Sequence, residues 1–105
     1  MATKTIEIRA KYKSGTTTVN ALITHPMEAG IRINSKTGTA VLPHFIQEVT
    51  CKHKEVTLMT AQWGIGMPQN PYLSFSFEGG VKGETVILKW VDNKGDSDSA
   101  EAIIR

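Results

Sequence analysis

Short runs in which hydrophobic and polar residues alternate dominate this chain of 105 residues. In residues 4–11, Ile6, Ile8 and Ala10 fall on one side of an extended chain, and charged residues fall on the other. Residues 73–77 repeat the pattern with serines between large apolar residues. A two-residue period is typical of half-buried β-strands, and we find no helix-length 3.6-residue period. The pattern therefore predicts an all-β protein.

Turn signals separate the alternating runs about every 8–12 residues, a spacing typical of an antiparallel sandwich. Clear signals are Ser14-Gly15, the Gly/Pro-rich stretch 63–71 and Asp92-Asn93-Lys94-Gly95. We therefore predict an antiparallel β-sandwich of seven or eight short strands. The predicted strands are residues 4–11, 16–24, 45–52, 56–61, 73–77, 86–91 and 97–104, with a further hairpin whose arms are residues 30–35 and 39–43.

Composition narrows the class of protein. Hydrophobic residues make up 40% and charged residues 21% of the chain, an ordinary balance for one globular domain over residues 1–105. The net charge of +2 is too small to indicate nucleic-acid binding, and no apolar stretch approaches the roughly 18 residues of a membrane span. The first residues lack the apolar core of a signal peptide, and a lone cysteine excludes an internal disulfide. By themselves these features favour a cytoplasmic location for the protein.

The spacing of the cysteine and the histidines argues against a metal site. His25, His44, Cys51 and His53 lack the close ligand pairs of zinc sites, apart from Cys51 and His53. Cys51 is in phase with Phe45 and Val49 and opposite Ile46, so we expect it in the core. His53 is expected to be a solvated turn residue. We predict no bound metal and no cofactor.

Catalysis is not indicated either. A nucleophilic Cys51 would need exposure and a positive neighbour, but Lys52 and Lys54 are expected on the other face. The acidic residues are scattered over strand surfaces and turns, and no Gly-x-Ser-x-Gly motif is present. We assign no catalytic residue.

Two loops carry residue types suited to recognition. The stretch "THPMEAG" follows a β-branched run, and its proline and glycine restrict the backbone, as do those of the 63–72 loop. Either "THPMEAG" is a turn whose histidine caps backbone groups, or the two loops form one surface that meets a partner. In a further alternative, Trp63 and Met67 cap the core and only Met27 and Glu28 are exposed. The candidate interface residues are His25, Met27, Glu28, Arg32, Trp63, Ile65, Met67, Asn70 and Tyr72.

Several motifs in order resemble the SoxZ family. "LITHPMEAGIR" resembles its His-Pro-Met-Glu-x-Gly-x-Arg motif, and "FIQEVTC" resembles its strand ending in Thr-Cys. "NPYLSF" and "LKWVDNKGDSDSAEA" resemble its Asn-Pro-Tyr motif and its C-terminal hairpin. The resemblance covers most of residues 6–104.

The resemblance implies an immunoglobulin-like sandwich that is the non-catalytic half of a heterodimer with SoxY. It implies that sulfur intermediates are bound covalently to a cysteine in a flexible Gly-rich tail of SoxY. It also implies that the heterodimer is presented in turn to the other Sox enzymes. It also implies a periplasmic location, reached by export with a signal-bearing SoxY. Two rival hypotheses remain: a free-standing sandwich that binds a small ligand or metal through its loops, and an enzyme that uses Cys51 as the sulfur carrier.

Overall fold

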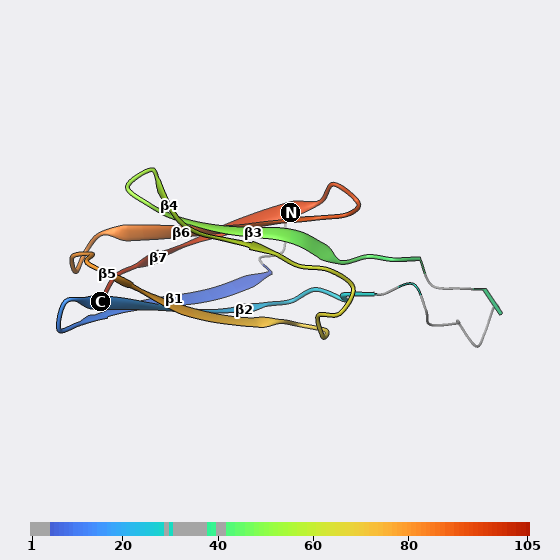
Figure 1. The fold of residues 1–105 in the computed structure, drawn as a ribbon, viewed down its shortest axis with the longest axis horizontal. Coiled ribbons are helices and arrows are strands. Elements are labelled where there is room, and N and C mark those ends of the chain that lie inside the picture. The colour runs from blue at the N-terminus through green and yellow to red at the C-terminus, as the bar shows by residue number, and fades with distance from the viewer. Residues whose placement is uncertain (1–4, 29, 31–37, 40–41) are drawn as a thin grey trace.

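The computed structural model describes residues 5–28, 30, 38–39 and 42–105. Within these residues, seven antiparallel strands form two sheets that pack face to face (Figure 1). The strands are β1 (Ile6–Lys13), β2 (Thr16–Ile23), β3 (Ile46–His53), β4 (Val56–Gln62), β5 (Tyr72–Glu78), β6 (Thr85–Asp92) and β7 (Ser97–Ile103). The all-β sandwich predicted from the alternating pattern is therefore confirmed. The predicted hairpin with arms 30–35 and 39–43 falls largely outside the described residues.

The two sheets differ in size and are joined along one side. The smaller sheet has the order β1-β2-β5, and the larger has the order β4-β3-β6-β7. At the joined side the Arg105 amide donates to the Ala10 carbonyl at 3.0 Å, and the Tyr12 amide donates to the Arg105 carbonyl at 2.8 Å. Of the residues that the structure describes, none belongs to a helix long and apolar enough to cross a membrane.

Most strand phases are as predicted. Val86, Leu88 and Trp90 of β6 are buried, and Ile87 and Lys89 between them are exposed. Among the described residues, the core consists of fourteen buried hydrophobic residues, which come from β1, β2, β3, β6, β7 and the segment after β7 and include Met27. β4 and β5 supply only half-buried apolar side chains to it.

The predicted phase of β3 is wrong at its start. We expected Ile46 on the face opposite Val49 and Cys51, but the structure buries all three. The register between β3 and β6 shifts between Ile46 and Glu48, which marks a β-bulge. Because a bulge adds one residue to one strand, it reverses the alternation, and Gln47 and Glu48 are both exposed. The prediction that Cys51 lies in the core is confirmed.

Candidate functional site

Three polar side chains meet at the end of the sandwich where β2 and β6 end and β3 begins. His25 follows β2, His44 precedes β3, and Asp92 is the last residue of β6. The Nε2 atoms of His25 and His44 lie 3.1 Å and 2.8 Å from the same atom, Asp92 Oδ2. The Asp92 side chain has no exposed surface, and that of His25 is only 3% exposed. We call these three residues the His–Asp cluster.

Hydrogen bonds around the His–Asp cluster fix the proton positions on His25. The Met27 amide donates to His25 Nδ1 at 3.1 Å, so Nδ1 presents a lone pair and carries no proton. His25 Nε2 therefore bears the ring proton and donates a hydrogen bond to Asp92 Oδ2. The other carboxylate oxygen, Oδ1, accepts the amides of Lys94 and Asp96, each at 2.9 Å. Asp92 thus accepts four hydrogen bonds.

These bonds keep Asp92 charged although it is buried. Burial alone would raise the pKa of the Asp92 carboxyl, because a low dielectric disfavours the charged form. The hydrogen bonds from His25, His44, and the Asp96 and Lys94 amides act in the opposite direction, and together they hold the pKa below its ordinary value. In the described residues no buried side-chain nitrogen or oxygen lacks a hydrogen-bond partner. The His–Asp cluster is therefore a hydrogen-bonded network around a buried carboxylate, in which His25 is buried and His44 is half-buried.

The same network bears on metal binding. One ligand atom from each of His25, His44 and Asp92 lies within 4.8 Å of the others, close enough to surround one ion. A metal on His25 Nε2 would move the ring proton to Nδ1, where it would face the Met27 amide proton. The hydrogen bonds thus favour a structural network over a metal site. The sequence offers His25 and His44 as candidate ligands but gives no such signal for Asp92, because Asp92 lies in a stretch typical of a hairpin turn.

The structure brings the two predicted loops together. Asn70 Oδ1 accepts the His25 amide at 3.0 Å, and the Asn70 amide donates to the His25 carbonyl at 3.0 Å. Asn70 adopts a positive φ of 53°, a conformation that asparagine tolerates better than most residues. These two bonds join the 63–72 loop to the segment that carries His25 of the His–Asp cluster.

Two of the predicted interface residues are buried rather than exposed. Met27 is 6% exposed, so the expectation that it lies on the surface is wrong for this chain. The alternation of buried and exposed residues in β2 continues beyond its end: Ile23, His25 and Met27 are buried, whereas Thr24 and Pro26 are exposed. Met27 Sδ also accepts the Ile46 amide at 3.3 Å. This two-residue phase was the sequence signal that could have placed His25 and Met27 inside.

The remaining candidates lie at different depths. Glu28 is half-buried and forms an antiparallel bridge with His44. Trp63 and Met67 are half-buried and pack on the core, as the core-cap alternative expected. Ile65 and Tyr72 are 53% and 62% exposed, and Asn70 is also exposed. Arg32 lies outside the described residues. Whether any of these residues contacts a partner stays a prediction.

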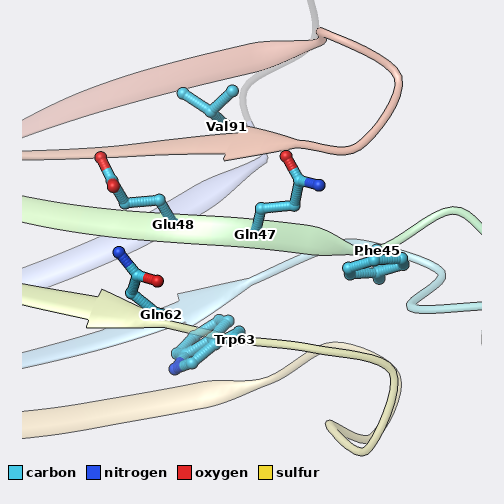
Figure 2. A pocket seen from close by; sticks show the side chains of 6 residues that line it. All are labelled: Phe45, Gln47, Glu48, Gln62, Trp63 and Val91. Atoms are coloured by element: carbon cyan, nitrogen blue, oxygen red, sulfur yellow. The ribbon is translucent and has the colours of Figure 1, made fainter.

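A shallow pocket lies beside the 63–72 loop on the larger sheet (Figure 2). Gln47 and Glu48 of β3 and Gln62 of β4 give it a polar floor, Phe45 lies just before β3, and Trp63 follows β4 beside Gln62. Among the described residues that line it, Glu48 is the only titratable group, so these residues do not supply the pair of acid–base groups that general catalysis uses. Val91 completes the lining.

Cys51 is unsuited to carry or attack a substrate. Its side chain is fully buried between the sheets. Burial raises the pKa of its thiol to about 11, so the reactive thiolate is scarce near neutral pH.

His53 lies at the opposite end of the sandwich and differs from our prediction. It is the last residue of β3, half-buried, and not a solvated turn residue. Its Nε2 lies 2.9 Å from Glu84 Oε1, and Lys54 pairs with the other carboxylate oxygen. The hydrogen bond from Lys54 is the main cause that holds the pKa of Glu84 below its ordinary value; the hydrogen bond from His53 contributes less. The turn that we predicted at His53 and Lys54 lies one residue later, between β3 and β4.

Comparisons with known proteins agree with this fold. Two solved structures of superoxide reductase (neelaredoxin) from Ignicoccus hospitalis, one of them described as T24K, are similar to the chain, each with a TM-score of 0.58. The T24K structure is 17% identical and the alignment covers 97% of this chain and 81% of that one; the other is 18% identical, with 96% and 80% covered. At this identity the likeness concerns the fold alone.

No curated protein matches the chain. The profile of the family described as "Sulphur oxidation protein SoxZ" matches residues 6–103, nearly the whole chain. The earlier motifs, at residues 22–32, 45–51, 70–75 and 88–102, all lie within this match. The chain belongs to the SoxZ family.

Proposed function

We propose that this protein is a non-catalytic subunit of the Sox sulfur-oxidation system, which binds SoxY and presents it to the other Sox enzymes. The observation that carries the proposal is the family match over residues 6–103. Its place of work is the periplasm, which it reaches by export together with a signal-bearing SoxY.

The position of Cys51 supports a non-catalytic role. A carrier cysteine has to reach several enzymes in turn, whereas Cys51 lies in the middle of β3 with no exposed surface. Its raised thiol pKa also opposes nucleophilic attack on a sulfur compound. We therefore place the covalent sulfur cargo on SoxY and not on this chain.

Calorimetry and intact mass spectrometry test the proposal together. Purified protein titrated into SoxY should form a one-to-one complex. After incubation of the complex with thiosulfate and the partner Sox enzymes, added sulfur should appear on SoxY, and the mass of this chain should stay unchanged. If the protein does not bind SoxY, the proposal is wrong. Sulfur attached to Cys51 would support the enzyme hypothesis instead.

A free-standing sandwich that binds a metal is the second candidate, because the His–Asp cluster gathers three ligand atoms. The test is equilibration of the tag-free protein with ZnCl₂, followed by desalting and elemental analysis, with His44→Ala as the comparison. We expect no stoichiometric zinc in either protein, given the proton positions on His25. One zinc per chain in the wild type, lost in His44→Ala, would favour the metal-binding candidate.

A further inference from the structure

The sandwich is closed on one side and open on the other. At the closed side, hydrogen bonds from Arg105 join β1 to the segment that follows β7. At the open side, β4 and β5 are the outer strands of their sheets, and the described residues form no ladder between them. The fully buried hydrophobic residues avoid both strands. Six large apolar side chains near the opening are instead half-buried: Leu58, Met59, Trp63, Leu73, Phe75 and Phe77.

The strands at the closed side carry several charged residues, whereas those at the open side carry almost none. β1 carries Glu7, Arg9, Lys11 and Lys13, and β7 also carries two acidic residues. β4 has the sequence VTLMTAQ without a charged residue, and β5, YLSFSFE, has a charge only at its last position. Charged residues on an outer strand normally prevent unwanted pairing with other chains. The open side therefore lacks the protection that an exposed sheet edge usually carries.

The ladder between β2 and β5 shows which backbone groups face the open side. The Ile23 amide donates to the Pro71 carbonyl, and the Gly79 amide donates to the Gly15 carbonyl. In an antiparallel ladder the hydrogen-bonded pairs alternate with non-bonded pairs. Both end pairs give the same alternation: the backbone groups of Leu73, Phe75 and Phe77 form hydrogen bonds with β2. The amides of Ser74 and Ser76 therefore point away from β2.

We infer that SoxY adds an extended strand to the outer edge of β5, with every second side chain apolar and inserted between β4 and β5. This inference rests on the proposed function, since it names where that partner binds. An extended chain fits because it can pair with the outward amides of Ser74 and Ser76, which a helix cannot do. Its two-residue period would send alternate side chains toward Leu73, Phe75 and Phe77. The added strand would also give the smaller sheet four strands, the same number as the larger one.

The test removes one outward amide. Ser76→Pro deletes the amide that points away from β2, and proline is tolerated at such positions on outer strands. Ser76→Ala is the matched control: it keeps the amide and removes only the hydroxyl, which lies 3.0 Å from Thr18 Oγ1. We expect Ser76→Pro to weaken SoxY binding by about tenfold or more and Ser76→Ala by less than about twofold. Circular dichroism checks that both variants fold.

Residue-resolved hydrogen exchange on the unmodified protein gives a second measurement that needs no variant. The amides of Leu73, Phe75 and Phe77 should be protected with or without SoxY. Those of Ser74 and Ser76 should become protected only in the complex. This pattern decides the matter even if Ser76→Pro does not fold.

Three outcomes would overturn the inference. The first is a folded Ser76→Pro variant that binds SoxY as tightly as the wild type. The second is unchanged exchange at Ser74 and Ser76 in the complex, with binding intact. The third is protection of these amides in the isolated protein together with a dimer in sedimentation, which would identify a second copy of this chain as the occupant. If the wild type binds no SoxY at all, the proposed function fails as well, so the two failures are distinguishable.

Discussion

The two ends of the sandwich each join histidine to a carboxylate, but in different surroundings. At one end, His25 and His44 share one oxygen of Asp92, whose side chain has no exposed surface. At the other end, His53 contacts Glu84 at 2.9 Å, and the second oxygen of Glu84 pairs with the exposed Lys54. The contact distances are similar. What differs is the burial of the carboxylate, because the Asp92 side chain has no exposed surface and that of Glu84 is 18% exposed.

This difference teaches that burial decides the importance of an ion pair or charged hydrogen bond. Removal of Asp92 would leave the buried ring N–H of His25, the ring N–H of half-buried His44 and two backbone amides without their acceptor. Removal of Glu84 would leave groups that water can reach. An uncompensated buried polar group costs its full desolvation, whereas exposed pairs contribute little. The four predictions below test this contrast between the ends.

Asp92→Ala should have the largest effect. We expect it to lower the free energy of unfolding by about 3 kcal/mol or more, because it breaks a buried charged network by removing its centre. Urea unfolding followed by circular dichroism measures this. Asp96→Ala is the matched control, since Asp96 lies in the same turn and contributes its backbone amide to the network. Equal stability of the two variants would refute the assigned role of Asp92.

Acid should weaken the Asp92 end. The pKa of Asp92 is lower in the folded chain than its ordinary value of 3.8, so its contribution to stability is fully present above about pH 4 and is lost as the pH falls through the folded pKa. Asp92→Asn cannot titrate. The stability difference between the wild type and Asp92→Asn should therefore shrink as the pH falls below about 4. A difference that stays constant down to pH 2 would contradict the lowered pKa.

Cys51→Ala provides a reference from the middle of β3, between the two ends. It removes a small buried group without disturbing either polar cluster, so we expect a loss of about 1 kcal/mol in the free energy of unfolding. Thiosulfate oxidation by the reconstituted system should be unaffected. In the wild type, the thiol should react slowly with a thiol reagent until the protein is unfolded. Rapid labelling of the native protein would show that Cys51 is accessible after all.

Glu84→Gln should have the smallest effect. The side chain keeps its size and can still accept a hydrogen bond from His53, while the pair with Lys54 is screened by water. We expect no measurable change in the midpoint of thermal unfolding. A decrease comparable to that of Asp92→Ala would mean that the two ends are equivalent and that burial does not distinguish them.

Local patterns were sufficient for most of the fold. Alternation predicted seven described strands near their observed positions, and the phase of β6 and the burial of Cys51 were correct. The prediction failed where alternation was interrupted or extended beyond expectation. The bulge in β3 inverted the expected side of Ile46, because an unpaired extra residue depends on the neighbouring strand and leaves no local signal.

The candidate site was less predictable than the fold. The sequence predicts Met27 on the surface, and His25 either in the rim of an interface or capping backbone groups in a turn, yet both residues continue the buried face of β2. Asn70 is a candidate interface residue from the sequence, and in the structure its side chain accepts a hydrogen bond from the His25 amide.

The sequence by itself determined the strand periodicity, the turns and the motifs of the SoxZ family, since each of these is written in neighbouring residues. Only the tertiary structure decided that Asp92 joins His25 and His44, which are 67 and 48 residues away along the chain. It also decided that the β1 and β7 side is closed and the β4 and β5 side open. Such pairings depend on which strands become neighbours and in which register, and side-chain alternation within one strand carries no information about either.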